Sequence, residues 1–196
     1  MMRSVFTIFA IFIYVFVLLT QIGCSDDVGT GAATASNHTE QGWHAYNSGN
    51  YTQALLSFER ALNIDPELAD AHNGIGWSHL SLALPLPLAQ EAFQNAVRYD
   101  ASNADAWVGL ANVLYLRYKD SSDFNAAIRA IDNALQADAK YLYRHDYHSN
   151  AELYALKAAC YIYLGETQLA KQEIDKAFQI DTENRTVIVL QNMLKE

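Results

Sequence analysis

The sequence predicts an all-α protein built as a stack of helical hairpins, and two regularities in its small residues support this prediction. Glycine or alanine recurs in four sets, and the second and third members of each set are seven residues apart. The sets are Gly42, Ala54 and Ala61; Gly76, Ala89 and Ala96; Ala111, Ala127 and Ala134; Ala158, Ala170 and Ala177. An aspartate follows each set, at Asp65, Asp100, Asp138 and Asp181. Because small residues at fixed places allow helices to cross closely, the pattern predicts a solenoid of stacked hairpins.

The composition suits one folded, mostly helical domain. The chain has 196 residues, of which 51% are hydrophobic and 18% are charged, and it contains three prolines. Its formal net charge is −9. Since a nucleic-acid partner requires a basic face, this charge argues against nucleic-acid binding.

The first residues differ in kind from the rest of the chain. An apolar run from Val5 to Leu19 is interrupted by Thr7 alone and follows the basic Arg3. This pattern predicts a signal peptide over residues 1–23, with an uncleaved membrane anchor as the alternative. Residues 24–34 are rich in Gly, Ala, Thr and Asp and show no apolar period, so we expect a flexible tether there.

The end of the predicted signal is similar to a bacterial lipobox. Gly23 and Cys24 match that motif, whereas Gln21 stands where an aliphatic residue is usual. The resemblance implies lipid attachment at Cys24 and an exported, periplasmic, membrane-attached protein. An ordinary signal peptide that is cut nearby, with Cys24 incidental, is the alternative. The other cysteine, Cys160, lies in an apolar helical stretch and is expected to be a buried free thiol.

The first hairpin carries the signature of a known repeat family. Ala54, Phe58, Ala61 and Leu62 form one apolar helical stripe, and Gly49 interrupts the helical pattern before it. The unit resembles a tetratricopeptide repeat (TPR) at Gly42, Tyr46, Gly49, Tyr51, Ala54, Phe58, Ala61, Leu62, Ile64, Asp65 and Pro66. The resemblance implies a TPR-type right-handed helical solenoid.

Four such units and a C-terminal capping helix are expected within a TPR domain over residues 35–196. The units span residues 35–68, 69–103, 104–141 and 151–184, and the cap spans 185–196. Pro85 and Pro87 predict an extended turn in the second unit, and the turn of the third unit is longer than the family pattern. An insertion over 142–150 precedes the fourth unit, in which Lys157 replaces the usual aliphatic residue. In the capping helix we expect the inward residues to be Val187, Ile188, Leu190 and Leu194.

The resemblance also implies a binding groove, because the first helix of each TPR hairpin lines the concave face. The expected partner-binding residues are Trp43, Tyr46, Asn47, Asn73, Trp77, Asn112 and Tyr115. Trp43 and Trp77 are 34 residues apart and therefore occupy equivalent places in neighbouring hairpins. Aromatic side chains of this kind dominate many binding surfaces, although rings that simply fill the space between helices are the alternative. Asp70, Asp105 and Glu152 are assigned to the dipoles of the first helices.

These observations favour a non-enzymatic adaptor that binds a protein or peptide partner near a membrane. The sequence shows no phosphate-binding loop and no nucleophile with a recognisable base, so neither catalysis nor a cofactor is expected. A structural subunit that uses its convex face and the 142–150 insertion is the alternative. A metal-dependent role at His145 and His148, three residues apart, is a weaker hypothesis.

Overall fold

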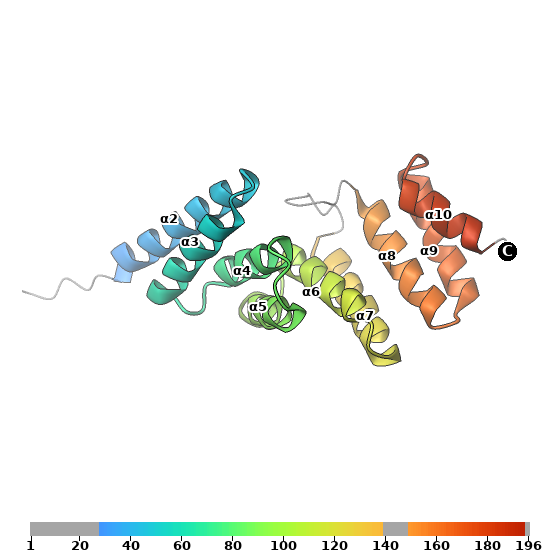
Figure 1. The fold of residues 1–196 in the computed structure, drawn as a ribbon, viewed down its shortest axis with the longest axis horizontal. Helices are drawn as coiled ribbons and strands as arrows, with labels where there is room; N and C mark the ends of the chain where they lie inside the picture. Colours follow the sequence, from blue (N-terminus) through green and yellow to red (C-terminus); the bar gives the residue numbers. More distant parts are fainter. Residues whose placement is uncertain (1–27, 139–148, 195–196) are drawn as a thin grey trace, which may run out of the picture.

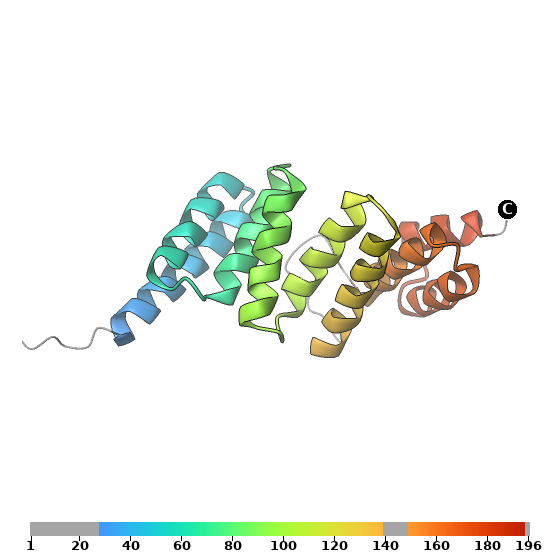
Figure 2. The ribbon, with the colours of Figure 1, turned by 90° about the horizontal axis from the view of Figure 1, so that it is seen from below.

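A computed structural model describes residues 28–138 and 149–194 of the chain and confirms the all-α solenoid. Within these residues it contains helices and no strand. The helices follow one another along an elongated stack, as Figures 1 and 2 show. They are α2 (Val28–Asn47), α3 (Tyr51–Ile64), α4 (Ala69–Ser81), α5 (Leu86–Tyr99), α6 (Ala104–Arg117), α7 (Ser121–Ala137), α8 (Asn150–Tyr163), α9 (Thr167–Ile180) and α10 (Arg185–Met193).

Consecutive helices pair into four hairpins, α2–α3, α4–α5, α6–α7 and α8–α9, and α10 packs against α8 and α9. The arrangement matches the predicted four repeats and capping helix. The predicted signal segment, the lipid site at Cys24, most of the 142–150 insertion and both His145 and His148 lie outside the described residues.

The structure differs from the predicted tether at its C-terminal part. Helix α2 begins at Val28, so residues 28–34 are helical and continue directly into the first repeat. The stretch Ala32 to Ser36 contains three alanines, the residue with the highest helix propensity. Once the first repeat has formed a helix, extending it costs less than starting a new one, because propagation needs no new nucleus.

The recurring aspartates end the second helix of each repeat. Asp65, Asp100, Asp138 and Asp181 are the C-cap residues of α3, α5, α7 and α9, and each has an extended backbone. In three of the four, an Oδ1 atom accepts a hydrogen bond from the backbone N–H two residues later, at 2.9–3.1 Å. Such an Asx turn reverses the chain, and at Asp65 and Asp100 a backbone hydrogen bond from the residue three positions later supports it. The aspartates therefore direct the chain from one repeat into the next.

The turns within the hairpins each contain one residue in the left-handed conformation. Gly49 (φ 75°) and Gly165 (φ 77°) take this position in the first and last hairpins. Ala83 (φ 52°) and Tyr118 (φ 45°) take it in the two hairpins with longer turns. Since a side chain disfavours positive φ, these two turns carry strain that glycine avoids. Pro85 is extended, as expected of this turn, whereas Pro87 already lies in the first turn of α5.

Two buried phenylalanines set the spacing between repeats. Phe58 packs between Gly42 and Gly74, and Phe93 packs between Gly76 and Gly109. A Cβ atom on Gly76 would lie 2.6 Å from the ring of Phe93, and one on Gly109 would lie closer still. In each case one glycine belongs to the same hairpin as the ring, and the other belongs to the next hairpin. The rings therefore fill slots that only glycine leaves open.

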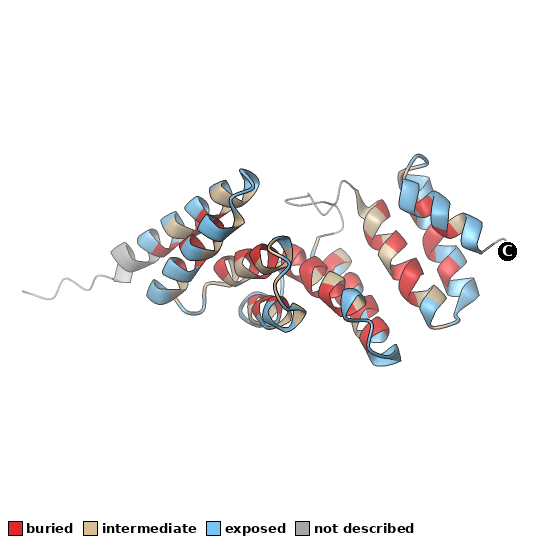
Figure 3. Ribbon diagram, in the orientation of Figure 1, coloured by how far each residue is buried: buried red, intermediate tan, exposed pale blue. Residues whose placement is uncertain are grey.

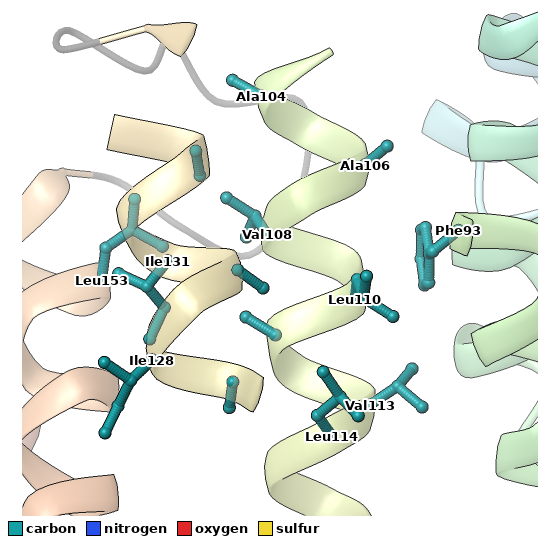
Figure 4. Packing of buried hydrophobic residues seen from close by; sticks show 14 of the residues in the cluster. Phe93, Ala104, Ala106, Val108, Leu110, Val113, Leu114, Ile128, Ile131 and Leu153 are labelled. Carbon is teal, nitrogen blue, oxygen red and sulfur yellow. The ribbon is translucent and has the colours of Figure 1, made fainter. Parts of the chain in front are cut away.

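The main hydrophobic core is continuous along the middle of the stack, where the buried residues in Figure 3 are concentrated. Figure 4 shows α6 between its neighbours, with Leu110 on the side of Phe93 and Val108 on the side of Ile131 and Leu153. The core thus runs from the second repeat through α6 and α7 to Leu153 of the fourth. Cys160 is part of this core as a buried free thiol, as predicted, and burial raises its pKa to about 12.

The unusual Lys157 is buried and paired. Its Nζ atom lies 2.5 Å from Oδ1 of Asp132 on α7 and 3.8 Å from Oε1 of Glu173 on α9. Burial alone would lower the pKa of Lys157, but the hydrogen bond to Asp132 and the charge of Glu173 raise it above its ordinary value. Lys157 therefore ties together three helices with charge, where the family usually has an aliphatic contact.

The capping helix is confirmed over Arg185–Met193, with one error in its predicted inward face. Val187 and Leu190 are buried and Leu194 is half-buried, whereas Ile188 is 40% exposed. Residues 187, 190 and 194 follow the helical period on one face, and residue 188 is rotated by one step, roughly 100°, away from it. The prediction of Ile188 as an inward residue was wrong for this reason.

We expect Gly109→Ala to destabilise the fold by about 1–3 kcal/mol, because the added methyl group overlaps the ring of Phe93. The free energy of unfolding in urea measures this loss. Combining Gly109→Ala with Phe93→Leu should cost less than the sum of the two single changes, since the smaller side chain vacates the slot. Arg129→Ala, at an exposed position on α7, is the control. Strictly additive costs would contradict the proposed slot.

Candidate functional site

A groove of about 470 Å³ crosses the first helices of the repeats and reaches the capping helix. Its lining comes from α2, α4, α6, α8 and α10 and contains none of the second helices. The lining residues are Tyr46, Trp77, Leu80, Ser81, Asn112, Tyr115, Leu116, Glu152, Ala155, Leu156, Ala159 and Thr186. A ligand there would contact all four repeats at once.

The groove combines apolar contact area with polar groups at its edges. Leu116 lines it at the C-terminal end of α6 and is 55% exposed. Tyr46 and Ser81 face each other across two repeats, with their hydroxyl oxygens 2.8 Å apart. The Asn112 side chain donates to the carbonyl of Val108 at 3.1 Å, which fixes the side chain along its own helix. The surface suits a segment that offers both apolar side chains and hydrogen-bonding groups.

Tyr115 belongs to a cluster of aromatic rings at one side of the groove. Its ring centroid lies 6.1 Å from that of Phe124 and 6.0 Å from that of Tyr163, and the rings of Phe124 and Tyr163 are stacked. Tyr118 completes the cluster against the same two rings. Burial, followed by the influence of Tyr163, raises the pKa of Tyr115 to about 12. The Tyr115 hydroxyl therefore remains protonated over the physiological range.

Trp77 is buried and contacts the next repeat. Its Nε1–H donates to Oδ2 of Asp105 at 3.1 Å, and the Asn73 amide donates to the same oxygen at 2.7 Å. Asp105 is itself buried, at the start of α6. One carboxylate therefore satisfies two buried donors of the preceding repeat. This contact comes in addition to the expected interaction of Asp105 with the dipole of α6.

Trp43 repeats this contact one hairpin earlier. Its Nε1–H donates to Oδ2 of Asp70 at 3.0 Å, and its ring packs edge-on against Phe58. We call the two contacts, Trp43–Asp70 and Trp77–Asp105, the tryptophan–aspartate links. Both tryptophans thus take part in stacking the repeats, and the edge of Trp77 also lines the groove.

The structure brings four of the seven predicted partner-binding residues into the groove, namely Tyr46, Trp77, Asn112 and Tyr115. Trp43 and Asn47 are not among the lining residues, and Asn47 is exposed at the end of α2. Asn73 has no exposed surface and holds Asp105 instead. Its expected direct contact with a partner is corrected to a role in positioning the next helix.

Sequence reasoning missed Ser81, Leu116, Leu156 and Thr186 as lining residues. Leu116 lies four residues after Asn112 and therefore on the same face of α6, a signal that was available. Thr186 could not be placed in the same way, because the angle at which α10 closes the stack is not encoded in the repeat.

Glu152 is the one charged side chain among the described residues that line the groove. It forms a capping box, in which Oε2 accepts from the backbone N–H of Ser149 at 2.8 Å. The carboxylate is thereby fixed at the rim. A groove with this charge and an acidic chain around it disfavours an anionic ligand.

The described part of the chain contains no group of three or more potential metal ligands. Among the same residues, no helix is both long and apolar enough to cross a membrane.

We expect Asp105→Ala to destabilise the fold by about 2–3 kcal/mol, because it removes the shared acceptor of two buried donors. Asp70→Ala should cost about 1 kcal/mol or less, since Trp43 and Asp70 are only half-buried and water can reach them. Equilibrium unfolding in urea, followed by tryptophan fluorescence, measures both changes. Equal losses would show that burial does not distinguish the two links.

Comparisons with known proteins agree with this architecture. Models described as TPR repeat or tetratricopeptide repeat match residues 45–82, 86–119 and 151–184, which together cover more than half of the chain. A search of curated proteins finds none that matches the sequence.

Solved structures with a similar fold include three of low sequence identity to this chain. The structure described for Pseudomonas aeruginosa pilF is 21% identical, with a TM-score of 0.68, and the match covers 84% of this chain and 69% of that one. The structure of MamA is 18% identical, with a TM-score of 0.64, and the match covers 81% of each chain. A tetratricopeptide repeat protein from Parabacteroides merdae is 14% identical, with a TM-score of 0.63, and the match covers 83% of this chain and 59% of that one.

At such identities the likeness shows the fold alone. The repeat matches, the four hairpins and the recurring small residues lead to the same result. The chain belongs to the tetratricopeptide repeat family.

Proposed function

We propose that this TPR protein is a non-enzymatic adaptor that holds a segment of a partner protein in the groove between α2 and α10, at a bacterial cell envelope. TPR repeats are protein–protein interaction modules, and their fold is typically a scaffold without catalysis. The observation that carries the groove assignment is its lining, because it joins side chains from every repeat into one surface. Such a surface recognises an extended or helical segment over several residues.

The side chains that line the groove indicate what kind of partner segment would bind there. Trp77, Leu80 and Leu156 offer apolar contact, so the segment should place at least one aliphatic or aromatic side chain against them. Asn112 and the tyrosine hydroxyls can bond to its polar groups. Glu152 at the rim favours a neutral or basic segment over an acidic one.

The envelope location is supported by the N-terminal sequence. The apolar run that precedes Gly23 and Cys24 suits export, and lipid attachment at Cys24 would hold the adaptor at a membrane. The residues between Cys24 and α2 are few, so the groove would remain close to the membrane surface.

We expect a photo-crosslinking residue at position 116, an exposed apolar position of the lining, to capture the groove partner, and a charge elsewhere in the lining to abolish this capture. A photo-crosslinking residue at position 116 in the full chain, expressed in its native cells, should label one partner. The label should be lost with Glu in place of Leu80 and retained in the matched control Leu88→Glu. Leu88 is 44% exposed and lies on α5, outside the groove.

Thermal unfolding of each variant provides the control for folding, which matters most for position 80 because Leu80 is half-buried against the core. At the exposed position 88 the change should be about 0.5 kcal/mol or less. A photo-crosslinking residue at position 88 that labels the same partner as strongly as one at position 116 would contradict groove binding and favour the convex face.

We expect metabolic labelling with palmitate to depend on Cys24. The wild-type chain should incorporate label into the membrane fraction, and Cys24→Ala should lose the label. Cys160→Ala, which removes the buried thiol, should retain it. Labelling that persists in Cys24→Ala, or that is absent from the wild type, would reject lipid attachment without affecting the groove assignment.

A further inference from the structure

The C-terminal end of the solenoid carries an apolar surface that a capping helix would normally lack. On α10, Ile188, Val189 and Met193 are 40%, 56% and 54% exposed, and we call these three residues the end face. Val189 and Met193 are four residues apart and lie one above the other on the helix. Terminal helices of solenoids usually present a polar outer surface, which keeps the stack soluble.

In the second repeat the equivalent positions are covered by the next helix. Counted from the N-cap, Val189 and Met193 are the fifth and ninth residues of α10. In α4 these positions hold Asn73 and Trp77, which are buried and bond to Asp105 on the first helix of the next repeat. The end face is therefore the surface on which a further helix would pack.

Phe178 on α9 also lies on a surface that the next repeat covers elsewhere in the stack. It follows Ala177, as Leu62, Val97 and Leu135 follow the corresponding alanines of the other repeats. Those three side chains are half-buried beside the next repeat, whereas Phe178 is exposed. Among the described residues, Phe178 thus lacks the cover that its three counterparts have.

We propose that a second copy of this chain covers the end face, with α10 packed antiparallel against α10 of the partner across a two-fold axis. Val189 and Met193 form one row in such a pair and Ile188 flanks it, and the pair is self-complementary because each copy presents the same face. Val189 lies at the middle of Arg185–Met193 and falls next to the axis.

The charges of α10 favour this occupant. The chain has a net charge of −9, and two copies repel each other over most of their surfaces. The segment Arg185–Met193 contains no acidic residue and one basic residue, Arg185. Arg185 stands at the N-terminus of α10, where it opposes the dipole of its own helix. In an antiparallel pair it lies beside the C-terminal end of the partner's α10, where a positive charge is stabilising.

Disulfide trapping in the full chain tests this arrangement. In a Cys24→Ala background the remaining native thiol, Cys160, is buried and does not react. Val189→Cys should then form a disulfide-linked dimer on mild oxidation in detergent solution. Leu56→Cys is the matched control, because Leu56 is 45% exposed on α3, at the other end of the stack. We expect at least about tenfold more dimer from position 189.

Sedimentation velocity of the full chain provides the second measurement. The protein should be a dimer, and Val189→Glu should weaken dimerisation at least about tenfold, since it places two like charges at the axis. Leu116→Glu in the groove should leave the dimer intact, which separates this result from the proposed function. A monomeric wild type, a dimer that survives Val189→Glu, or crosslinks from position 189 only to another protein would each overturn the proposal.

Discussion

The stack depends on a close contact between a phenylalanine ring and two glycines. Phe58 and Phe93 each lie between a glycine of their own hairpin and a glycine of the next hairpin. Because no Cβ atom fits in these slots, the ring fixes the distance between neighbouring repeats. The tryptophan–aspartate links need this distance, as each joins side chains from two repeats at hydrogen-bond length. The groove follows in turn, because its lining is shared among the same helices.

The architecture was largely readable from the sequence, and the reason is its repetition. Small residues recur at every helix crossing and an aspartate recurs at every exit from a repeat, so each unit supports the assignment of the others. The start of α2 was less readable, because residues 28–34 become helical by continuation of the first repeat. The position of Ile188 was misjudged by one residue, which on a helix turns a side chain from the core to solvent.

The groove was only partly predictable for a different reason. The 34-residue spacing of Trp43 and Trp77 shows that they are equivalent, but it does not show which side chain of the next helix meets them. Asp70 and Asp105 meet them, and the burial of Asn73 follows from the same contact. These pairs depend on the angle and offset at which neighbouring hairpins cross. The spacing of repeated residues in the sequence does not specify that geometry. Tyr46, Asn112 and Tyr115 line the groove as expected from their place on the first helices, and their contact with a partner stays a prediction.

The junction of α7 and α8 differs from the earlier junctions in the contacts that hold it, and therefore in its sensitivity to salt. There Ile131 stands where the preceding repeat has Phe93, and Lys157 joins Asp132 and Glu173 by charge. Ionic contacts are screened by salt, whereas the packing of a ring in a glycine slot is not. Raising the salt concentration would therefore weaken the junction between the third and fourth repeats more than the two earlier junctions.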